Sequence, residues 1–338
     1  MQGRIFGACV LLLALLLGVP GSAFGTTLTV AYIPIMPMAQ LYVMQSEGWT
    51  KQAGLDLRLT KFSSGPAMVQ AMASGKYDVM YVGIGPAMVA RANGVPLKVV
   101  ASAVVEQIAL IAQGALAKDA AGAQSAADAI RAFTAEHHRK PKIATLPKGS
   151  VPDLVLRYWL ERRAKLPIDS VEIVGMGEDR VQQALLTRSV DGASILEPIV
   201  TIVRERMPDA RILVAGGAMF PDQPGAVVAV TQRALKDDPA AITQLVALHI
   251  RATELLHSDP ARAARDIYPF LGQGLVPLAT IERAVRSPVS HFVSDPRKIV
   301  DATREMRDFS KEIGTLAKPV PVKELFDTAI YQAAQRQQ

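Results

Sequence analysis

Short apolar runs and longer amphipathic runs alternate along most of the chain. Residues 28–34 (LTVAYIP) and 55–62 (LDLRLTKF) are short and either apolar or alternating, which is typical of β-strands. Residues 39–52 lie between them and are predicted to form a helix, which Gly54 is placed to end. Residues 28–62 therefore predict a strand, a helix and a second strand.

The same alternation continues through two thirds of the sequence and predicts an α/β protein. Further strands are expected at 77–82, 97–103, 142–145, 171–174, 192–196, 211–214 and 227–231, and helices at 66–74, 86–93, 152–164 and 180–187. Residues 104–112 interrupt the rhythm as a crossing strand, and the Ala-rich residues 117–135 predict a surface helix or loop. From residue 239 onward the pattern predicts helices, with Pro260, Pro269, Pro288 and Pro296 between them. Strands that alternate with helices imply mainly parallel sheets with right-handed crossovers, here in two units with a helical tail.

Two stretches far apart in the chain have nearly the same layout. Residues 74–86 read SGKYDVMYVGIGP and residues 187–198 read TRSVDGASILEP. In each, an Asp comes just before a predicted strand, where its side chain can hold a turn, and a Pro follows the strand. Ligands of open α/β sheets bind outside the carboxyl ends of the strands. We therefore expect two similar lobes whose strand ends, at Gly83–Pro86 and Glu197–Pro198, form opposite walls of one cleft.

The N-terminus has the layout of a secretory signal peptide over residues 1–25. Arg4 precedes an apolar run at 10–19, and small residues suited to cleavage follow it. An uncleaved membrane anchor is the alternative, although the run is short for a membrane span. The single cysteine, Cys9, lies inside this segment, so the mature chain would have no thiol, disulfide or cysteine nucleophile.

Composition narrows the partners that the mature protein could have. The chain has 338 residues, is 50% hydrophobic and carries a net charge of +6, with Lys and Arg scattered among Asp and Glu. This size favours two domains, and the dispersed charge predicts a solvated basic surface and no nucleic-acid partner.

The motifs in their order resemble the periplasmic substrate-binding proteins of the taurine, sulfonate and nitrate type, which include the NMT1-like proteins. The matching segments are VAYIP, SEGWTKQAGLDL, SSGPAMVQAMASGKYDV, GIGP, ATLPKGSVPDLVLRYWL and SVDGASILEP. The resemblance covers roughly residues 27–270 and implies a type II periplasmic-binding-protein fold. It implies a lobe 1 of residues 26–104 and 232–338 and a lobe 2 of residues 105–231, with crossing segments near 104–114 and 220–232.

The resemblance also implies a function. A protein of this type captures a small organic ligand in the periplasm, here expected to be a sulfonate, a carboxylate or a related aromatic or pyrimidine compound. It closes around the ligand and delivers it to the permease of an ABC transporter. We expect a monomer without cofactor, bound metal or catalytic residues, because the sequence offers no nucleophile, metal or acid–base constellation. A ligand-sensing module for a membrane receptor and an enzyme on the same scaffold are the alternatives.

The ligand-binding residues that the resemblance implies lie in six loops. They are Ile33, Pro34 and Met36 after the first strand, Ser64 and Gly65, Gly83, Ile84 and Gly85, Gly149 and Ser150, Glu197 and Pro198, and Pro224.

Two of these loops have a physical reason to bind an acidic group. The segments SSGP and KGSVP place Ser and Gly directly before a helix, where backbone N–H groups and the helix dipole favour an anionic oxygen. Ser64 and Ser150 could instead be ordinary N-caps, and Asp153 could complete a capping arrangement and repel an anion. No Arg or Lys other than Lys148 lies in the matched loops.

The remaining loops leave the chemistry open. Glu197 could bind an amine or hydroxyl of the ligand, or could orient its own loop. Several methionines, among them Met36, Met38 and Met176, would suit an apolar or aromatic ligand part, although core packing is the common role of methionine.

Overall fold

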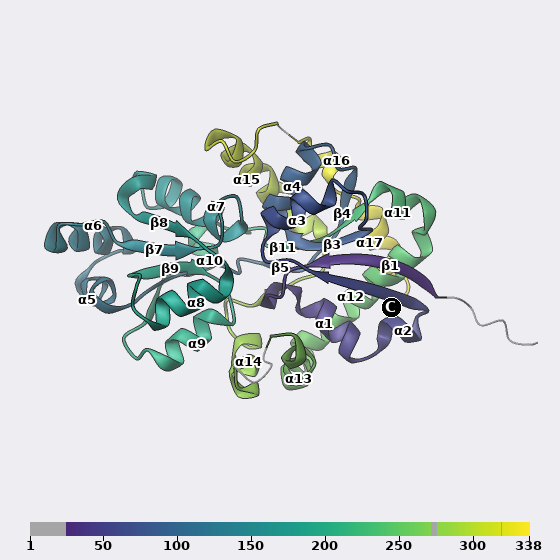
Figure 1. Cartoon of the computed structure of the whole chain (residues 1–338), viewed down its shortest axis with the longest axis horizontal. Helices are drawn as coiled ribbons and strands as arrows, with labels where there is room; N and C mark the ends of the chain where they lie inside the picture. Colours follow the sequence, from purple (N-terminus) through teal and green to yellow (C-terminus); the bar gives the residue numbers. More distant parts are fainter. Residues whose placement is uncertain (1–24, 272–275, 319) are drawn as a thin grey trace, which may run out of the picture.

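The computed structural model describes residues 25–271, 276–318 and 320–338, so that the predicted signal peptide, except for its last residue, and Cys9 lie outside the described residues. It contains two five-stranded sheets that lie side by side along the long axis of the molecule (Figure 1). The first sheet has the order β2 (Leu55–Lys61), β1 (Thr26–Tyr32), β3 (Val79–Gly83), β11 (Ala226–Thr231), β4 (Leu97–Ser102). The second has the order β10 (Arg211–Val214), β6 (Ala109–Ala112), β9 (Gly192–Ile195), β7 (Lys142–Thr145), β8 (Glu172–Gly175). A small ribbon pairs β5 (Val104–Val105) with β12 (His291–Phe292).

Helices cover both faces of each sheet, and we call each sheet with its helices a lobe. In the first lobe α3 and α4 lie over one face and α1, α12 and α13 over the other, while in the second lobe α7 and the pair α8 and α9 lie on opposite faces (Figure 1). The helices are α1 (Ala39–Ser46), α2 (Trp49–Gln52), α3 (Gly65–Met72), α4 (Ile84–Ala92), α5 (Gly114–Gly122), α6 (Ala126–His137), α7 (Val151–Tyr158), α8 (Glu178–Leu186), α9 (Ile199–Arg206), α10 (Gly216–Met219), α11 (Gln232–Asp237), α12 (Pro239–Ser258), α13 (Pro260–Leu271), α14 (Leu278–Val285), α15 (Val300–Glu312), α16 (Val322–Leu325) and α17 (Thr328–Gln335). Shorter turns are η1 (Met36–Met38), the π-helical η2 (Trp159–Arg163), η3 (Ile168–Ser170) and η4 (Pro296–Ile299). The expected two-lobed α/β class with a helical C-terminal region is confirmed.

Each sheet contains one reversed strand among the strands described. In the first sheet β11 is antiparallel to β3 and β4, while the other strands share one direction. In the second sheet β6 is antiparallel to β9 and β10, and the rest share one direction. The chain enters each sheet through its reversed strand, directly after it crosses between the lobes. Both sheets are therefore mainly parallel, with one antiparallel crossing strand each.

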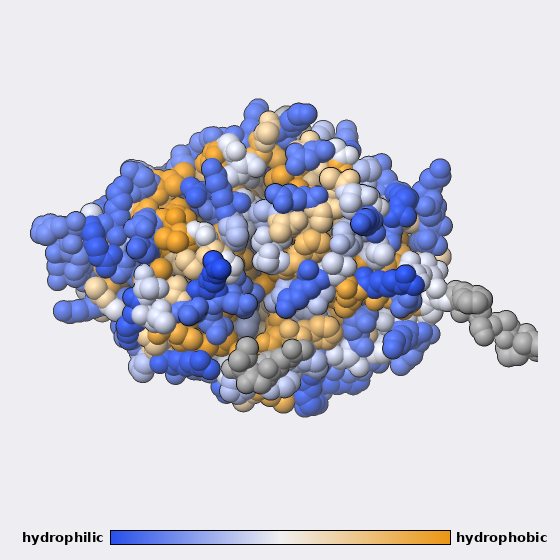
Figure 2. Space-filling model, in the orientation of Figure 1, coloured by the Kyte–Doolittle hydropathy of each residue, from blue (hydrophilic) through white to orange (hydrophobic). Residues whose placement is uncertain are grey.

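Burial along the strands explains the sequence pattern. β11 in the first sheet and β6 and β9 in the second are buried at every residue, as expected where helices cover both faces. Along the edge strand β2 the buried Leu55 and the half-buried Leu57 and Leu59 alternate with exposed residues. On the outer face drawn in Figure 2, hydrophilic residues are spread over both lobes with smaller hydrophobic areas between them.

Three expected elements are divided in the structure. The crossing strand expected at 104–112 forms β5 and β6, and residues 106–108 between them belong to no strand. The helix expected at 39–52 forms α1 and α2, because Gly48 between them adopts a left-handed backbone with φ 70°. The Ala-rich residues 117–135 lie in two helices, α5 and α6, and Ser125 caps the second by accepting a hydrogen bond from Asp128 N–H.

The two segments that cross between the lobes run side by side. Glu106 N–H donates to Gln223 O over 2.9 Å, Gly225 N–H donates to Val104 O over 3.1 Å, and Asp222 N–H donates to the Glu106 carboxylate over 2.9 Å. The predicted division of the chain into lobes at residues 104 and 231 stays a prediction. The pairing of β11 with β3 and β4 places β11 within the first sheet.

Candidate functional site

The carboxyl ends of strands from both sheets meet at a small cavity between the lobes. The cavity has a volume of about 30 Å³. Its lining residues are Ile33, Ile35, Met38, Ser64, Gly65, Gly83, Pro86, Gln107, Leu146, Ser150, Val151, Pro152, Leu196 and Ala226. They come from loops and helix starts that are far apart in the chain, as the cleft hypothesis requires.

The residues expected to bind a ligand fall into three groups. Five line the cavity itself: Ile33, Ser64, Gly65, Gly83 and Ser150. Four border the spaces beside it: Met36 and Glu197 at a void of about 10 Å³, and Pro34 and Pro198 at a groove of about 420 Å³. The structure does not place the remaining four, Ile84, Gly85, Gly149 and Pro224, among the lining residues of these spaces.

Two glycines allow the lobes to approach closely beside the cavity. A Cβ placed on Gly83 would lie 2.8 Å from Val151 Cγ2, and one on Gly85 would lie 2.8 Å from Leu154 Cδ1. A Cβ at either position requires the facing side chain on α7 to shift. The two glycines expected to contact a ligand therefore have a second role, because they let the lobes meet.

The two serines that the sequence treats alike have different environments. Ser64 is a true N-cap, since its Oγ accepts a hydrogen bond from Ala67 N–H over 3.3 Å. Ser150 stands at the N-cap position of α7 but makes no side-chain cap bond, and its buried Oγ has no hydrogen-bond partner. Of the two, Ser150 is therefore the one whose hydroxyl is free to bind a ligand.

Asp153 fastens the loop in front of α7. Its carboxylate is buried, accepts a hydrogen bond from Gly149 N–H over 2.9 Å, and pairs with Arg157 Nε over 2.8 Å. Gly149 has a left-handed backbone with φ 85°, which a glycine adopts without strain. The carboxylate therefore holds the loop that presents Ser150 to the cavity.

Gln107 is a cavity residue that the sequence analysis missed. It lies on the crossing segment, is buried, and its Oε1 has no partner among the described residues. A signal for it exists, because Gln107 is a polar residue inside the apolar run 104–112, and a buried polar group without a structural partner often serves a ligand. The other missed residues are Leu146, Val151, Pro152, Leu196 and Ala226, which flank the expected loops or crossing segment.

The Glu197 carboxylate forms its hydrogen bonds close to its own loop, with Thr201 at the start of α9. Its carboxylate accepts hydrogen bonds from both Thr201 N–H and Thr201 Oγ1 over 3.0 Å. Burial raises the pKa of Glu197, and hydrogen bonds from Ser287 and Thr201 work against that rise. Both carboxylate oxygens of Glu197 therefore orient the start of α9. The sequence had left this role open as the alternative to ligand binding.

A charged groove lies on the outer side of the cavity and shares Ile33 with it. Lys61 and Arg180, both exposed, line the groove together with Glu178 and Asp179. Burial raises the pKa of Glu178, and the nearby Asp179 raises it further. The groove therefore presents charges of both signs at the mouth of the cleft.

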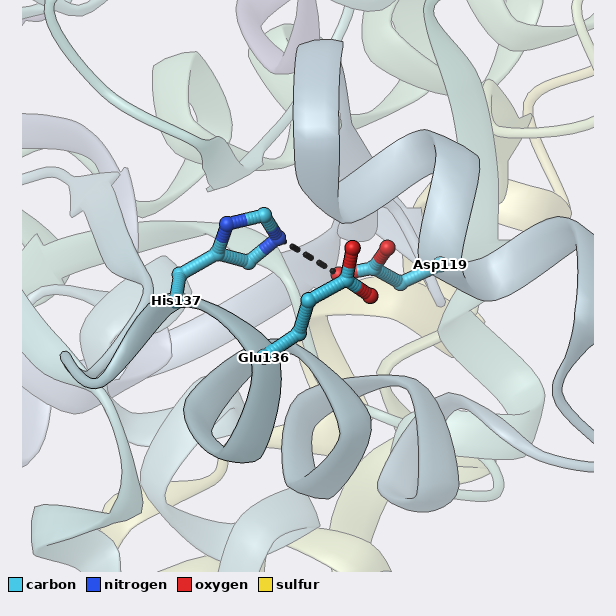
Figure 3. Close-up of side chains that lie close together, drawn as sticks. All are labelled: Asp119, Glu136 and His137. Atoms are coloured by element: carbon cyan, nitrogen blue, oxygen red, sulfur yellow. Dashed lines mark hydrogen bonds and ion pairs between the residues drawn. The ribbon is translucent and has the colours of Figure 1, made fainter.

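A possible cation cluster lies far from the cleft. Asp119 on α5 and Glu136 and His137 on α6 place ligand atoms within 4.8 Å of one another, and the His137 ring faces the Asp119 carboxylate (Figure 3). His137 Nε2 and Asp119 Oδ2 are 3.2 Å apart, and Glu136 is exposed. We interpret the cluster as a His–Asp pair that joins α5 to α6, because this contact already occupies both partners.

Within the described ranges, every helix is too short or too polar to cross a membrane.

Comparisons with known proteins agree with this architecture. The model of the NMT1-like family matches residues 23–268. A Brucella abortus protein that is named as a binding protein is 26% identical over 295 residues, which are 84% of each chain.

Solved structures with the same fold have lower identity. The nitrate-binding protein of Synechocystis PCC 6803 matches with a TM-score of 0.76 at 14% identity, covering 92% of this chain and 89% of that one. The alkanesulfonate-binding protein of Xanthomonas axonopodis, bound to MOPS, matches with a TM-score of 0.71 at 18% identity, covering 89% and 98%. A ligand-binding component of an ABC-type import system from Staphylococcus aureus, with zinc bound, matches with a TM-score of 0.73 at 17% identity, covering 92% and 99%. At these identities the likeness establishes the two-lobed fold.

Proposed function

The chain belongs to the NMT1-like family, and on that premise we propose that it is an exported solute-binding protein. It captures a small organic ligand between its lobes and delivers it to the permease of an ABC transporter. The proposal places the mature protein in the periplasm as a monomer without enzymatic activity.

One observation carries the proposal. Loops from both lobes and from a crossing segment contribute Ile33, Gln107 and Ser150 to one small cavity at the strand ends. In open α/β sheets this is the place where ligands bind. The relatives support the proposal further, because the matched structures are named for nitrate binding, alkanesulfonate binding and ABC-type import.

Closure of the lobes is part of the proposed mechanism. The cavity of about 30 Å³ has room for about two water molecules at ~15 Å³ each, and not for an organic solute. A ligand must therefore enter while the lobes are apart, and it favours closure to the extent that it binds the closed form better. The crossing segments with their few backbone hydrogen bonds are the natural hinge.

An engineered crosslink tests this mechanism. A Cβ built on Gly83 lies 3.8 Å from Val151 Cβ, which is about the usual Cβ–Cβ distance of a disulfide, ~3.8 Å. The predicted mature chain has no other cysteine, so Gly83→Cys with Val151→Cys gives one defined crosslink between the lobes. The ligand is first found by thermal-shift screening against sulfonates, aromatic acids, nitrate and pyrimidines, and binding to the reduced and oxidised double variant is then compared by calorimetry.

We expect the reduced double variant to bind the hit. The double variant oxidised in the absence of ligand should bind it at least tenfold more weakly, which corresponds to a loss of about 1.4 kcal/mol in binding free energy. Each single cysteine variant, treated with the same oxidant, is the control. Equal affinity in both redox states would show that the ligand does not enter this cleft. Conversion of the hit to a product would favour an enzyme, and normal uptake of the hit by cells that lack the protein would contradict delivery.

A further inference from the structure

We propose that the cavity selects an uncharged ligand: a compact, mainly apolar molecule with at least one N–H or O–H group, such as an amide, and not a sulfonate, carboxylate or nitrate. The inference rests on the proposed function, because it concerns the same cavity. It also reverses the sequence expectation that the SSGP and KGSVP segments hold an acidic group.

The cavity lining is the first argument. None of the described residues that line it is charged, and its polar side chains are limited to Ser64, Gln107 and Ser150. Moving an ion from water into such surroundings without a partner of opposite charge costs far more than moving a neutral polar group. An anion would have no cation to pair with at this place.

The helix starts around the cavity are the second argument. The helices α3, α4 and α7 begin here, and each has a proline in its first turn: Pro66, Pro86 and Pro152. Proline has no backbone N–H, so each of these helix starts lacks one of the donors that would bind an anionic oxygen. Pro86 and Pro152 present apolar ring surface to the cavity instead.

Three further N–H groups at or next to these helix starts bond within the protein. Ala67 N–H donates to Ser64 Oγ over 3.3 Å, and Ile84 N–H donates to Gly225 O over 2.9 Å. Gly149 N–H donates to the Asp153 carboxylate over 2.9 Å. Asp153 also places a negative charge in the first turn of α7, where it offsets the positive end of the helix dipole. This arrangement disfavours a second anion next to Ser150.

Two unpaired polar atoms show what the ligand must offer. Ser150 Oγ and Gln107 Oε1 are buried and have no hydrogen-bond partner, and their side chains, 5% and 4% exposed, both line the cavity. An unpaired buried polar atom is costly, so a ligand that supplies the missing hydrogen bond gains free energy. A carbonyl oxygen such as Gln107 Oε1 only accepts, and it therefore calls for an N–H or O–H donor on the ligand.

A cationic ligand is not favoured by the nearby acids. Glu197 lies at the neighbouring void and is bonded to Thr201 through both oxygens. Glu178 and Asp179 line the outer groove beside Lys61 and Arg180, and the raised pKa of Glu178 favours its neutral form, so the acids of this groove do not outweigh its bases.

Matched pairs of neutral and anionic compounds test the charge preference. Benzamide, nicotinamide, cyclohexanecarboxamide and benzenesulfonamide are compared with the corresponding acids at pH 7.5 by thermal shift and calorimetry. We expect at least one neutral member to bind about a hundredfold more tightly than its acid, because the acid is desolvated without a partner. Equal or tighter binding of the acids overturns the inference and leaves the proposed function standing. Failure of both series and of the wider screening panel contradicts the proposed function itself.

Variants of the two unpaired residues test the hydrogen bonds. Ser150→Ala and Gln107→Leu should each weaken binding of the neutral compound by about tenfold, the value of one hydrogen bond. The matched control is Ser310→Ala on α15, which also removes a buried unpaired hydroxyl but does not line the cavity. It should leave the affinity unchanged. Gln107→Lys adds a cation and should shift the preference toward the acid. Unchanged affinity in both Ser150→Ala and Gln107→Leu would overturn the assignment of these groups.

Discussion

His249 on α12 is an example of a residue whose role is set by its surroundings. It is fully buried, its Nε2 lies 2.7 Å from Ser102 O, and its Nδ1 lies 3.4 Å from the Tyr81 hydroxyl. Burial lowers the pKa of His249 to about 4, while the hydrogen bond to Ser102 works in the opposite direction. The imidazole is therefore neutral in the folded protein throughout the physiological range.

This pKa predicts a pH dependence of stability. Between an unfolded pKa of about 6.5 and the folded value, the unfolded chain binds a proton that the folded protein does not, so stability falls as the pH falls. At pH 5 the loss should be about 2 kcal/mol relative to pH 7.5. Urea unfolding of the natural protein and of His249→Gln at both pH values isolates this contribution. We expect the stability difference between the two proteins to shrink by that amount at pH 5, and a constant difference would contradict the assignment.

Single residues also mark where sequence reasoning stops. Ser64 and Ser150 occur in similar segments before a helix, yet only Ser64 caps its helix and only Ser150 has an unpaired hydroxyl. The sequence could predict that both lie at the cleft. It could not predict which hydroxyl is free, because that depends on Asp153 bonding Gly149 from within α7.

At the scale of elements, the repeated sequence segment has a repeated structural role. Asp78, directly before β3, accepts hydrogen bonds from Thr29 N–H over 2.9 Å and Thr29 Oγ1 over 2.6 Å, and pairs with Arg233. Asp191, directly before β9, accepts from Lys142 N–H over 2.7 Å and pairs with Arg139. Burial raises the pKa of Asp191, but the bonds from Arg139 and Lys142 outweigh it and lower the pKa overall. In each lobe an Asp thus fastens one strand to its parallel neighbour.

Removing the charge of one such Asp should weaken its sheet. Asp78→Asn keeps the size of the side chain but loses the charged hydrogen bonds to Thr29 and Arg233, and should lower the free energy of unfolding by about 2 kcal/mol. Chemical denaturation measures this. Asp56→Asn on the edge strand β2 is the control, because Asp56 is exposed and its pair with Arg58 is 3.5 Å long. Its effect should stay within about 0.5 kcal/mol, and an equal effect of both variants would contradict the fastening role.

Elements were predictable where their signal is local. The strands and helices of both lobes follow from the alternation of apolar and polar residues and from Pro and Gly at their ends. The reversed direction of β6 and β11 was not predictable, because it depends on which remote strands they pair with after the chain crosses between lobes.

At the scale of the whole molecule, two helices join the lobes on opposite sides of the junction, α15 on one and α14 on the other (Figure 1). On α15, Glu305 accepts a hydrogen bond from the Tyr158 hydroxyl, and Glu312 pairs with Arg162 of the second lobe. On α14, Thr280 Oγ1 donates to Glu205 of α9 over 2.8 Å. Burial, and then the bond to Glu305, raise the pKa of Tyr158 to about 12, so the phenol keeps its proton and can donate.

Loosening these contacts should shift the lobes toward an open arrangement. Glu305→Gln with Glu312→Gln weakens both α15 contacts, each of which is partly exposed and worth about 0–1 kcal/mol. We expect the ratio of closed to open protein without ligand to fall by about fivefold, with a larger radius of gyration in small-angle X-ray scattering and a loss of ligand affinity.

The control for this variant is Glu161→Gln, because Glu161 contacts Arg162 at 4.0 Å from within the same lobe. It should leave the scattering profile unchanged. The role of α15 in closure would be contradicted if the double variant had the same radius of gyration as the natural protein, both without and with ligand.

The sequence by itself determined the α/β class, the order of the strands and helices, the family resemblance and the loops that meet at the cleft, because local periodicity and short motifs are written in consecutive residues. The tertiary structure alone decided the chemistry of the cavity. The prolines, the occupied N–H groups, Asp153 and the unpaired Gln107 act together only when loops from two lobes are brought within hydrogen-bond distance. Charge preference is a property of that assembled environment, and no single segment carries it.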